Sequence, residues 1–163
     1  MNIFALSDDP KLAAQYHCDK HVNKMLLESV QILNGSLYER DLDDLAFYGY
    51  NHKHHPCTLW AAESWANFEW LVRLTHHLNN EWRLRYDHDE HHTSYRKLLS
   101  NWRADGGWAV PAFEEQRTPF AQAMVDDVKQ DDSIAAYRDY YRQYKQPADW
   151  FEYSRGRDSP EWL

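Results

Sequence analysis

The sequence contains few of the residues that interrupt long helices. Its 163 residues include only five Gly and six Pro, and β-branched residues are few. Sandwiches and barrels of β-strands need many turns and many β-branched positions, so this scarcity argues against them. Apolar residues still make up 43% of the chain and aromatic residues 15%, which excludes a disordered polypeptide. We therefore predict an all-α fold.

Cysteine, positive charge and long apolar runs are scarce as well. Two cysteines, Cys18 and Cys57, favour free thiols in a reducing compartment. The formal net charge of −8 argues against a broad basic surface that follows a nucleic-acid backbone, so any phosphate contact must be local. No apolar run is long enough to cross a bilayer, and the start lacks a signal-peptide pattern. We expect a cytoplasmic protein with no membrane partner.

Helix start and stop signals predict a compact bundle of four to five helices in one domain, residues 1–163. Asp9 and Pro10 suit a helix start, Gly35 suits a helix stop, and Pro56 suits a second start. The stretch WAVPAFEEQRTPFAQAM predicts an ordered loop containing Pro and Trp, with one helical turn at its end, residues 120–124. The predicted helices span about 10–34, 56–85 and 89–102, with a last one from 132 onward.

The first predicted helix has an unusual polar face. At about 100° per residue, Cys18, Val22 and Met25 point to the core. The opposite side carries His17, Lys20, His21, Lys24, Glu28 and Gln31. His17 and His21 are four residues apart, which is a spacing typical of metal ligands. Two lysines on the same arc would repel a dication, so this face favours an anion or is an ordinary solvated surface.

The leading interpretation is an enzyme that binds a phosphate-bearing substrate, either a nucleotide or a nucleic-acid base. Lys20 and Lys24 would hold the anion through charge-assisted hydrogen bonds. His17 and His21 would move protons, while Glu28 and Glu63 would orient or exchange them. The pocket would lie between the first and second long helices, where four further residues are expected to contact the substrate: Gln31, His55, Asn67 and Trp70.

Two alternatives remain open. In one, the protein is a metal-dependent enzyme whose iron or zinc is held by His17, His21, His55 and Glu28, or by Glu63 in place of Glu28. In the other, it is a non-catalytic acidic inhibitor or decoy that binds a host protein through ERDLDDL and VDDVKQDD. No Gly-rich phosphate loop, dinucleotide fingerprint, Cys-pair zinc motif or nucleophilic Ser elbow is present to decide between these classes.

Three motifs carry a resemblance: HCDKHVNKMLLE at residues 17–28, HKHHPCTLWAAESWANFEWL at residues 52–71, and PFAQAM at residues 119–124. Through them the chain resembles a family of small proteins that recurs in tailed-phage genomes. In that family PFAQAM is usually followed by proline, whereas Val125 stands here. The resemblance does not imply any particular activity. It implies a phage-type protein in a bacterial cytoplasm, where nucleic-acid metabolism and host defence are common targets.

Overall fold

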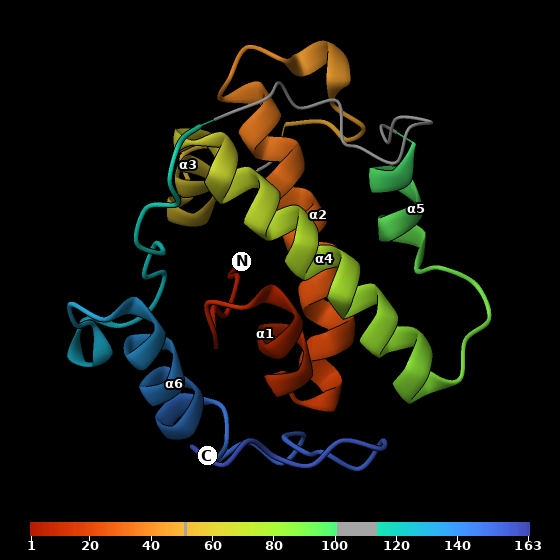
Figure 1. Cartoon of the computed structure of the whole chain (residues 1–163), viewed down its shortest axis with the longest axis vertical. Helices are drawn as coiled ribbons and strands as arrows, with labels where there is room; N and C mark the ends of the chain where they lie inside the picture. Colours follow the sequence, from red (N-terminus) through yellow and green to blue (C-terminus); the bar gives the residue numbers. More distant parts are fainter. Residues whose placement is uncertain (51, 101–113) are drawn as a thin grey trace.

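The computed structural model describes residues 1–50, 52–100 and 114–163, and these contain helices but no β-strand (Figure 1). The predicted all-α class is therefore confirmed. The elements are α1 (Pro10–Tyr16), α2 (Asp19–Tyr38), the 3₁₀ turn η1 (Asp43–Leu45), α3 (Pro56–Glu63), α4 (Trp65–Tyr86), α5 (Thr93–Leu99), the 3₁₀ turn η2 (Asp126–Val128) and α6 (Ser133–Tyr144).

The core forms where α4 packs across α2 and against α1, with α3 against α2 (Figure 1). Cys18, Val22 and Met25 are buried as the helical pattern predicted. Tyr137 and Tyr141 of α6 are also fully buried and join the same core. Among the described helices, none combines the length and the apolar character that crossing a bilayer requires.

The amino-terminal segment is part of this core although it is not helical. The side chains from Ile3 to Leu6 are buried, and the ring of Phe4 stacks on His21 at a centroid distance of 4.7 Å. Phe4 has a φ of 38°, a left-handed conformation that is costly for a residue with a bulky side chain. The side chain of Asn2 accepts hydrogen bonds from the backbone N–H groups of Ile3 and Phe4, which fixes this bend.

The predicted helix over residues 10–34 is two helices, because the chain is extended at His17 and Cys18. The break leaves helix-end groups that distant residues satisfy. The N–H of Cys18 donates to the Tyr141 hydroxyl (2.9 Å), and that of Asp19 donates to the Glu152 carbonyl (3.0 Å). These partners lie far away in the sequence, so helical periodicity gives no sign of the break.

Gly35 does not end α2, which continues to Tyr38. A Cβ atom at Gly35 would lie 2.9 Å from Cγ2 of Thr58, closer than side chains approach one another. The glycine therefore allows α2 and α3 to pack closely, and this need for space explains a residue that the sequence presents as a helix stop.

The other predicted helices are recovered with shifted ends. Pro56 begins α3, but Ser64 interrupts the predicted helix and caps α4 by accepting the Asn67 N–H (3.1 Å). Asp132 caps α6 as expected. The predicted helix over 89–102 is shorter, since α5 covers Thr93–Leu99, and its expected end at residue 102 lies outside the described residues, as do loop residues 108–113. Residues 120–124 are not helical; a 3₁₀ turn occurs at η2 instead.

Candidate active site

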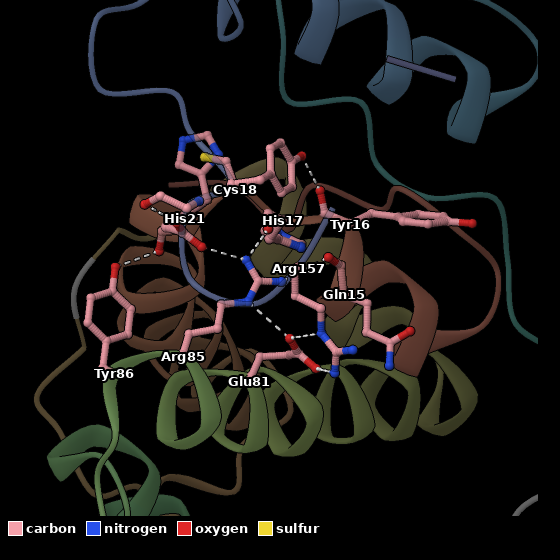
Figure 2. Close-up of polar contacts among 12 residues, drawn as sticks. Gln15, Tyr16, His17, Cys18, His21, Glu81, Arg85, Tyr86 and Arg157 are labelled. Carbon is pink, nitrogen blue, oxygen red and sulfur yellow. Dashed lines mark hydrogen bonds and ion pairs between the residues drawn. The ribbon is translucent and has the colours of Figure 1, made fainter. Parts of the chain in front are cut away.

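A closed ionic cluster lies beneath the break between α1 and α2, and Figure 2 shows Arg85 at its centre. We call it the Arg85 cluster: Asp19, Glu81, Arg85 and Arg157. The buried guanidinium of Arg85 donates to the carboxylates of Asp19 and Glu81 (3.0 Å each) and to the carbonyls of Gln15 and His17 (2.9 and 2.8 Å). Glu81 also accepts two hydrogen bonds from Arg157. With its charges paired, this cluster joins α1, α2, α4 and the C-terminal tail.

His17 and His21 lie inside the protein rather than on a solvated face. His17 is fully buried, and its Nδ1 lies 2.6 Å from the Ala13 carbonyl, so Nδ1 must carry a proton and donate. His21 is 4% exposed, and its Nδ1 lies 2.8 Å from the Tyr141 hydroxyl. Because that hydroxyl accepts from the Cys18 N–H, its own proton is available to His21.

Burial sets the protonation of both rings. Desolvation lowers the pKa of His17 to about 4, against the opposing effect of its bond to Ala13. Desolvation, helped by the positive charges of His17 and Lys145, lowers the pKa of His21 to about 2. Both imidazoles are therefore neutral at physiological pH and do not readily take up a proton. These values argue against the predicted role of the two histidines as proton carriers.

The predicted metal-ligand set of His17, His21, His55 and Glu28 is not brought together. The rings of His17 and His21 have centroids 6.5 Å apart and planes 70° apart, and both Nδ1 atoms have other partners. In residues 1–50, 52–100 and 114–163, no group of three His, Cys, Asp or Glu side chains is arranged to hold a metal ion. The break contributes to this, because His17 precedes α2 and does not share one continuous helix face with His21.

A second polar cluster lies at the start of the chain. We call it the Glu28 cluster: Asn2, Lys24, Glu28 and His55. The Glu28 carboxylate accepts the backbone N–H of Asn2 at 2.8 Å, and its other oxygen lies 3.6 Å from the Lys24 ammonium. The pKa of His55 is lowered by burial and then by the positive charge of the chain's α-amine, while Glu28 raises it. The amine, the carboxylate and the imidazole therefore influence one another.

An open groove of about 430 Å³ borders this cluster through His55. Its far wall is the loop that contains PFAQAM, and Asn2 is tied to this loop because its side-chain amide donates to the Ala123 carbonyl (2.8 Å). The lining residues are His55, Pro56, Gln122, Ala123, Met124, Val125, Lys129 and Tyr140. Three residues of PFAQAM, Gln122, Ala123 and Met124, therefore face the groove beside the Glu28 cluster.

Three other predicted site residues have contacts elsewhere. Glu63 is exposed and accepts from the Thr118 hydroxyl (3.0 Å), and buried Asn67 donates to the same hydroxyl (2.8 Å). The indole N–H of Trp70 donates to the Asp8 carbonyl (2.7 Å). These contacts hold loops in place and do not connect to the Glu28 cluster. Lys20 and Lys24 are exposed on α2, and Gln31 is half-buried on the same helix.

Asn2 was not predicted as a site residue, and no local pattern could have identified it. Its contacts with Glu28 and Ala123 span 26 and 121 residues of sequence. The predicted face of α2 does contribute Glu28 and Lys24, and the segment before α3 contributes His55. Three members of the cluster were thus among the predicted site residues, while the fourth depends on the contact between Asn2 and Ala123.

A family model described as pyrimidine dimer DNA glycosylase matches residues 1–94, more than half of the 163 residues. Comparisons with curated proteins and with solved structures gave no match. The matched range includes the whole Glu28 cluster and the first two of the three motifs, whereas PFAQAM lies beyond it. The match supports the resemblance to a small protein family and the general expectation of an enzyme related to nucleic acid. The chain belongs to the pyrimidine dimer DNA glycosylase family.

Proposed function

We propose that the protein removes dimerised pyrimidine bases from DNA, with the reaction taking place at the Glu28 cluster. The family match supports the substrate class, since it covers the residues of this cluster. The observation that carries the proposal is the 2.8 Å contact between the backbone nitrogen of Asn2 and the carboxylate of Glu28. A nitrogen next to a carboxylate is suited to covalent attack on the sugar, provided that the nitrogen is an amine.

Removal of Met1 would convert the Asn2 nitrogen from an amide into an α-amine, and an α-amine loses its proton more readily than a lysine side chain does. The neutral amine attacks C1′ of the deoxyribose. The C1′–N1 bond breaks, and the pyrimidine leaves with the electron pair and takes up a proton. Opening of the sugar ring then gives an imine between C1′ and the amine nitrogen.

Glu28 serves this sequence in two ways. Its carboxylate orients the attacking nitrogen through the hydrogen bond and accepts a proton from it. Once that proton has passed to the departing pyrimidine, the carboxylate is negative again and stabilises the protonated imine that follows. Loss of a proton from C2′ then expels the 3′ phosphate and cuts the strand, and water hydrolyses the remaining imine to release the enzyme.

The groove next to the cluster supports the same substrate. A base inside a duplex is out of reach, so an enzyme that acts on it must work on an extruded nucleotide. The groove volume of about 430 Å³ lies within the range of small-ligand sites. Tyr140 lines the groove and offers an aromatic wall that suits a base.

The test is borohydride trapping on a duplex that carries one defined pyrimidine dimer. We expect a stable protein–DNA adduct, and peptide mapping should place it on Asn2 in a protein whose intact mass lacks Met1. Glu28→Gln should abolish both the adduct and strand cutting. Glu63→Gln, which changes an exposed glutamate on α3, should leave both unchanged.

Three outcomes would count against the proposal. An adduct on Lys24 would transfer the reaction to that side chain. Strand cutting that proceeds equally in Glu28→Gln would remove the carboxylate from the mechanism. Equal reaction with undamaged DNA would refute the proposed substrate.

A further inference from the structure

Three lysines surround His21 on a protein that is acidic overall. Lys20 and Lys24 come from α2, and Lys145 follows α6 directly. The positive charges of all three act on the His21 ring. Contacts place two of them near it: the Lys145 ammonium lies 5.8 Å from the Phe4 ring that stacks on His21, and Lys20 lies over Trp150 beside His21. With a formal net charge of −8, such a local concentration of positive charge is the kind of site that can hold an anion.

Aromatic rings lie between these lysines. The Lys20 ammonium lies 4.8 Å from the centre of the Trp150 ring, and the Lys145 ammonium lies 4.6 Å from the centre of Tyr140. His21 connects the two pairs, because its ring is 5.1 Å from Trp150 and stacks on Phe4, which in turn stacks on Tyr140. Trp150 and Tyr140 are partly exposed. Ammonium groups alternating with flat rings suit single-stranded nucleic acid, which combines phosphates with bases.

The Arg85 cluster fixes the tail that carries Trp150. Asp19 accepts from the backbone N–H of Ser154 (2.7 Å), and the Tyr153 hydroxyl donates to the Tyr16 carbonyl (2.6 Å). Arg157 is held in turn by Glu81, and Figure 2 shows this pair beside Arg85. Trp150 is therefore placed against α2 by residues on both sides of the α1–α2 break.

We propose that Lys20, Lys145 and Trp150 form a surface that binds one DNA strand and leads it to the Glu28 cluster. Lys20, Lys24 and Glu28 follow one another at four-residue intervals on α2, so the backbone of Lys20 lies about 12 Å along the helix axis from that of Glu28. Lys145 and Trp150 lie beyond residues 1–94, so the family match does not assign them. This inference rests on the proposed function, because it takes DNA as the substrate.

The test measures equilibrium binding of an undamaged duplex and of a single strand by fluorescence anisotropy across a salt series. All variants carry Glu28→Gln, so that binding is measured without reaction. The double variant Lys20→Ala/Lys145→Ala should bind at least tenfold more weakly at low salt. The slope of log K against log salt should decrease in magnitude by about 2, since each phosphate contact contributes roughly one unit. Lys97→Ala is the matched control.

Lys97 makes a similar contact with an aromatic ring but lies far from the proposed surface. The Lys97 ammonium lies 4.7 Å from the ring of Tyr48, much as Lys145 lies over Tyr140. Lys97 belongs to α5, which Figure 1 shows on the opposite side of the molecule from α6. Its removal changes net charge by half as much as the double variant does, so a general charge effect would give Lys97→Ala half of the double variant's change in slope, whereas a local contact would give it almost none.

Trp150→Ala should weaken single-strand binding roughly tenfold, as the loss of one stacking ring does, and Trp150→Phe should restore most of it. Circular dichroism checks that both variants fold. A salt slope that does not change in the double variant, or an equal change in Lys97→Ala, would overturn the inference. Competition by polyglutamate as strong as that by DNA of equal charge would also overturn it, because the surface would then bind any polyanion.

The binding test and the trapping test can fail separately. If the salt slope decreases in the double variant while the wild-type protein forms no adduct, the DNA-binding surface is supported and the proposed chemistry is refuted. If adducts form and depend on Glu28 while the slope is unchanged, the chemistry stands and this surface is refuted.

Discussion

The two polar clusters to which α2 contributes use similar groups in opposite ways. In the Arg85 cluster, the buried guanidinium donates to four acceptors, and both carboxylates have cationic partners. In the Glu28 cluster, a half-buried carboxylate faces a segment of backbone, an exposed ammonium and an open groove. A closed cluster stabilises the fold, whereas an open one leaves charge available to a ligand. Changes in the first should therefore alter stability, and changes in the second should alter activity.

The largest expected effect comes from Arg85→Ala. It would leave the buried carboxylates of Asp19 and Glu81 without their shared cation, which typically costs about 3–5 kcal/mol of unfolding free energy. Urea unfolding measures the loss. Arg73→Ala is the control, because Arg73 pairs with Glu69 on the exposed side of the same helix and should change stability by less than about 1 kcal/mol. Equal losses in the two variants would show that the Arg85 cluster contributes no more to stability than an exposed ion pair does.

The next largest expected effect is a loss of stability in acid, caused by the two buried histidines. In the unfolded chain they take up protons as pH falls below 6.5, but in the folded protein only near pH 4 for His17 and pH 2 for His21. The unfolded state therefore binds more protons below pH 6.5, and stability decreases as pH falls through that window. Between pH 7.5 and 5 the loss should be roughly 2 kcal/mol for each ring.

Urea unfolding at several pH values measures this dependence. Desolvation also lowers the pKa values of four other histidines, so their effect has the same sign: His55, His76, His77 and His92. At Glu81 burial raises the pKa, but the arginine partners outweigh it and lower the pKa overall, so its contribution is lost only below about pH 4.5 and does not obscure the window. A stability that stays constant from pH 7.5 to 5 would contradict the burial of His17 and His21.

Glu28→Gln is expected to alter activity with little change in stability. The rate of strand cutting should decrease by at least about 10²-fold, or roughly 3 kcal/mol of activation free energy, which is typical for loss of an acid–base group. Unfolding free energy should change by less than about 1 kcal/mol, because the amide oxygen still accepts the Asn2 N–H. A large loss of stability instead would place Glu28 with the structural groups.

The smallest expected effect comes from Lys24→Ala. The ammonium lies 3.6 Å from Glu28, and its side chain is 59% exposed, so the pair contributes only a few tenths of a kcal/mol. Unfolding in low salt should detect this difference, and high salt should remove it by screening. A loss above about 1 kcal/mol that persists in high salt would show that the Glu28 cluster is more tightly closed than its exposure indicates.

The sequence predicts those features of the fold that depend on local contacts. Asp9, Pro56 and Asp132 mark helix starts correctly, because a cap is formed with the next few residues. The breaks at His17 and Ser64 were not predicted. The first is held by Tyr141 and Arg85, whose contacts with it span more than 60 residues. Helical periodicity contains no information about such partners.

The predictions for the candidate site show the same difference between local and distant contacts. Glu28 and Lys24 were predicted as site residues because they share one face of a continuous helix, and His55 because it lies in a histidine-rich segment before a helix-starting proline. His17 and His21 have the same spacing as exposed neighbours, but the break and the packing of α6 place both rings in the interior. Spacing therefore defines a face of a helix, and only the tertiary contacts decide what covers that face.

The buried amino-terminal segment also has a consequence for synthesis in the cell. Its residues are made long before their partners, which are Ala123 for Asn2 and Tyr140 for Phe4. At about 5–20 residues per second, roughly 6–30 seconds separate the making of these two ends. Until the chain has been made as far as Tyr140, a nascent chain therefore holds Glu28 without the complete groove beside it.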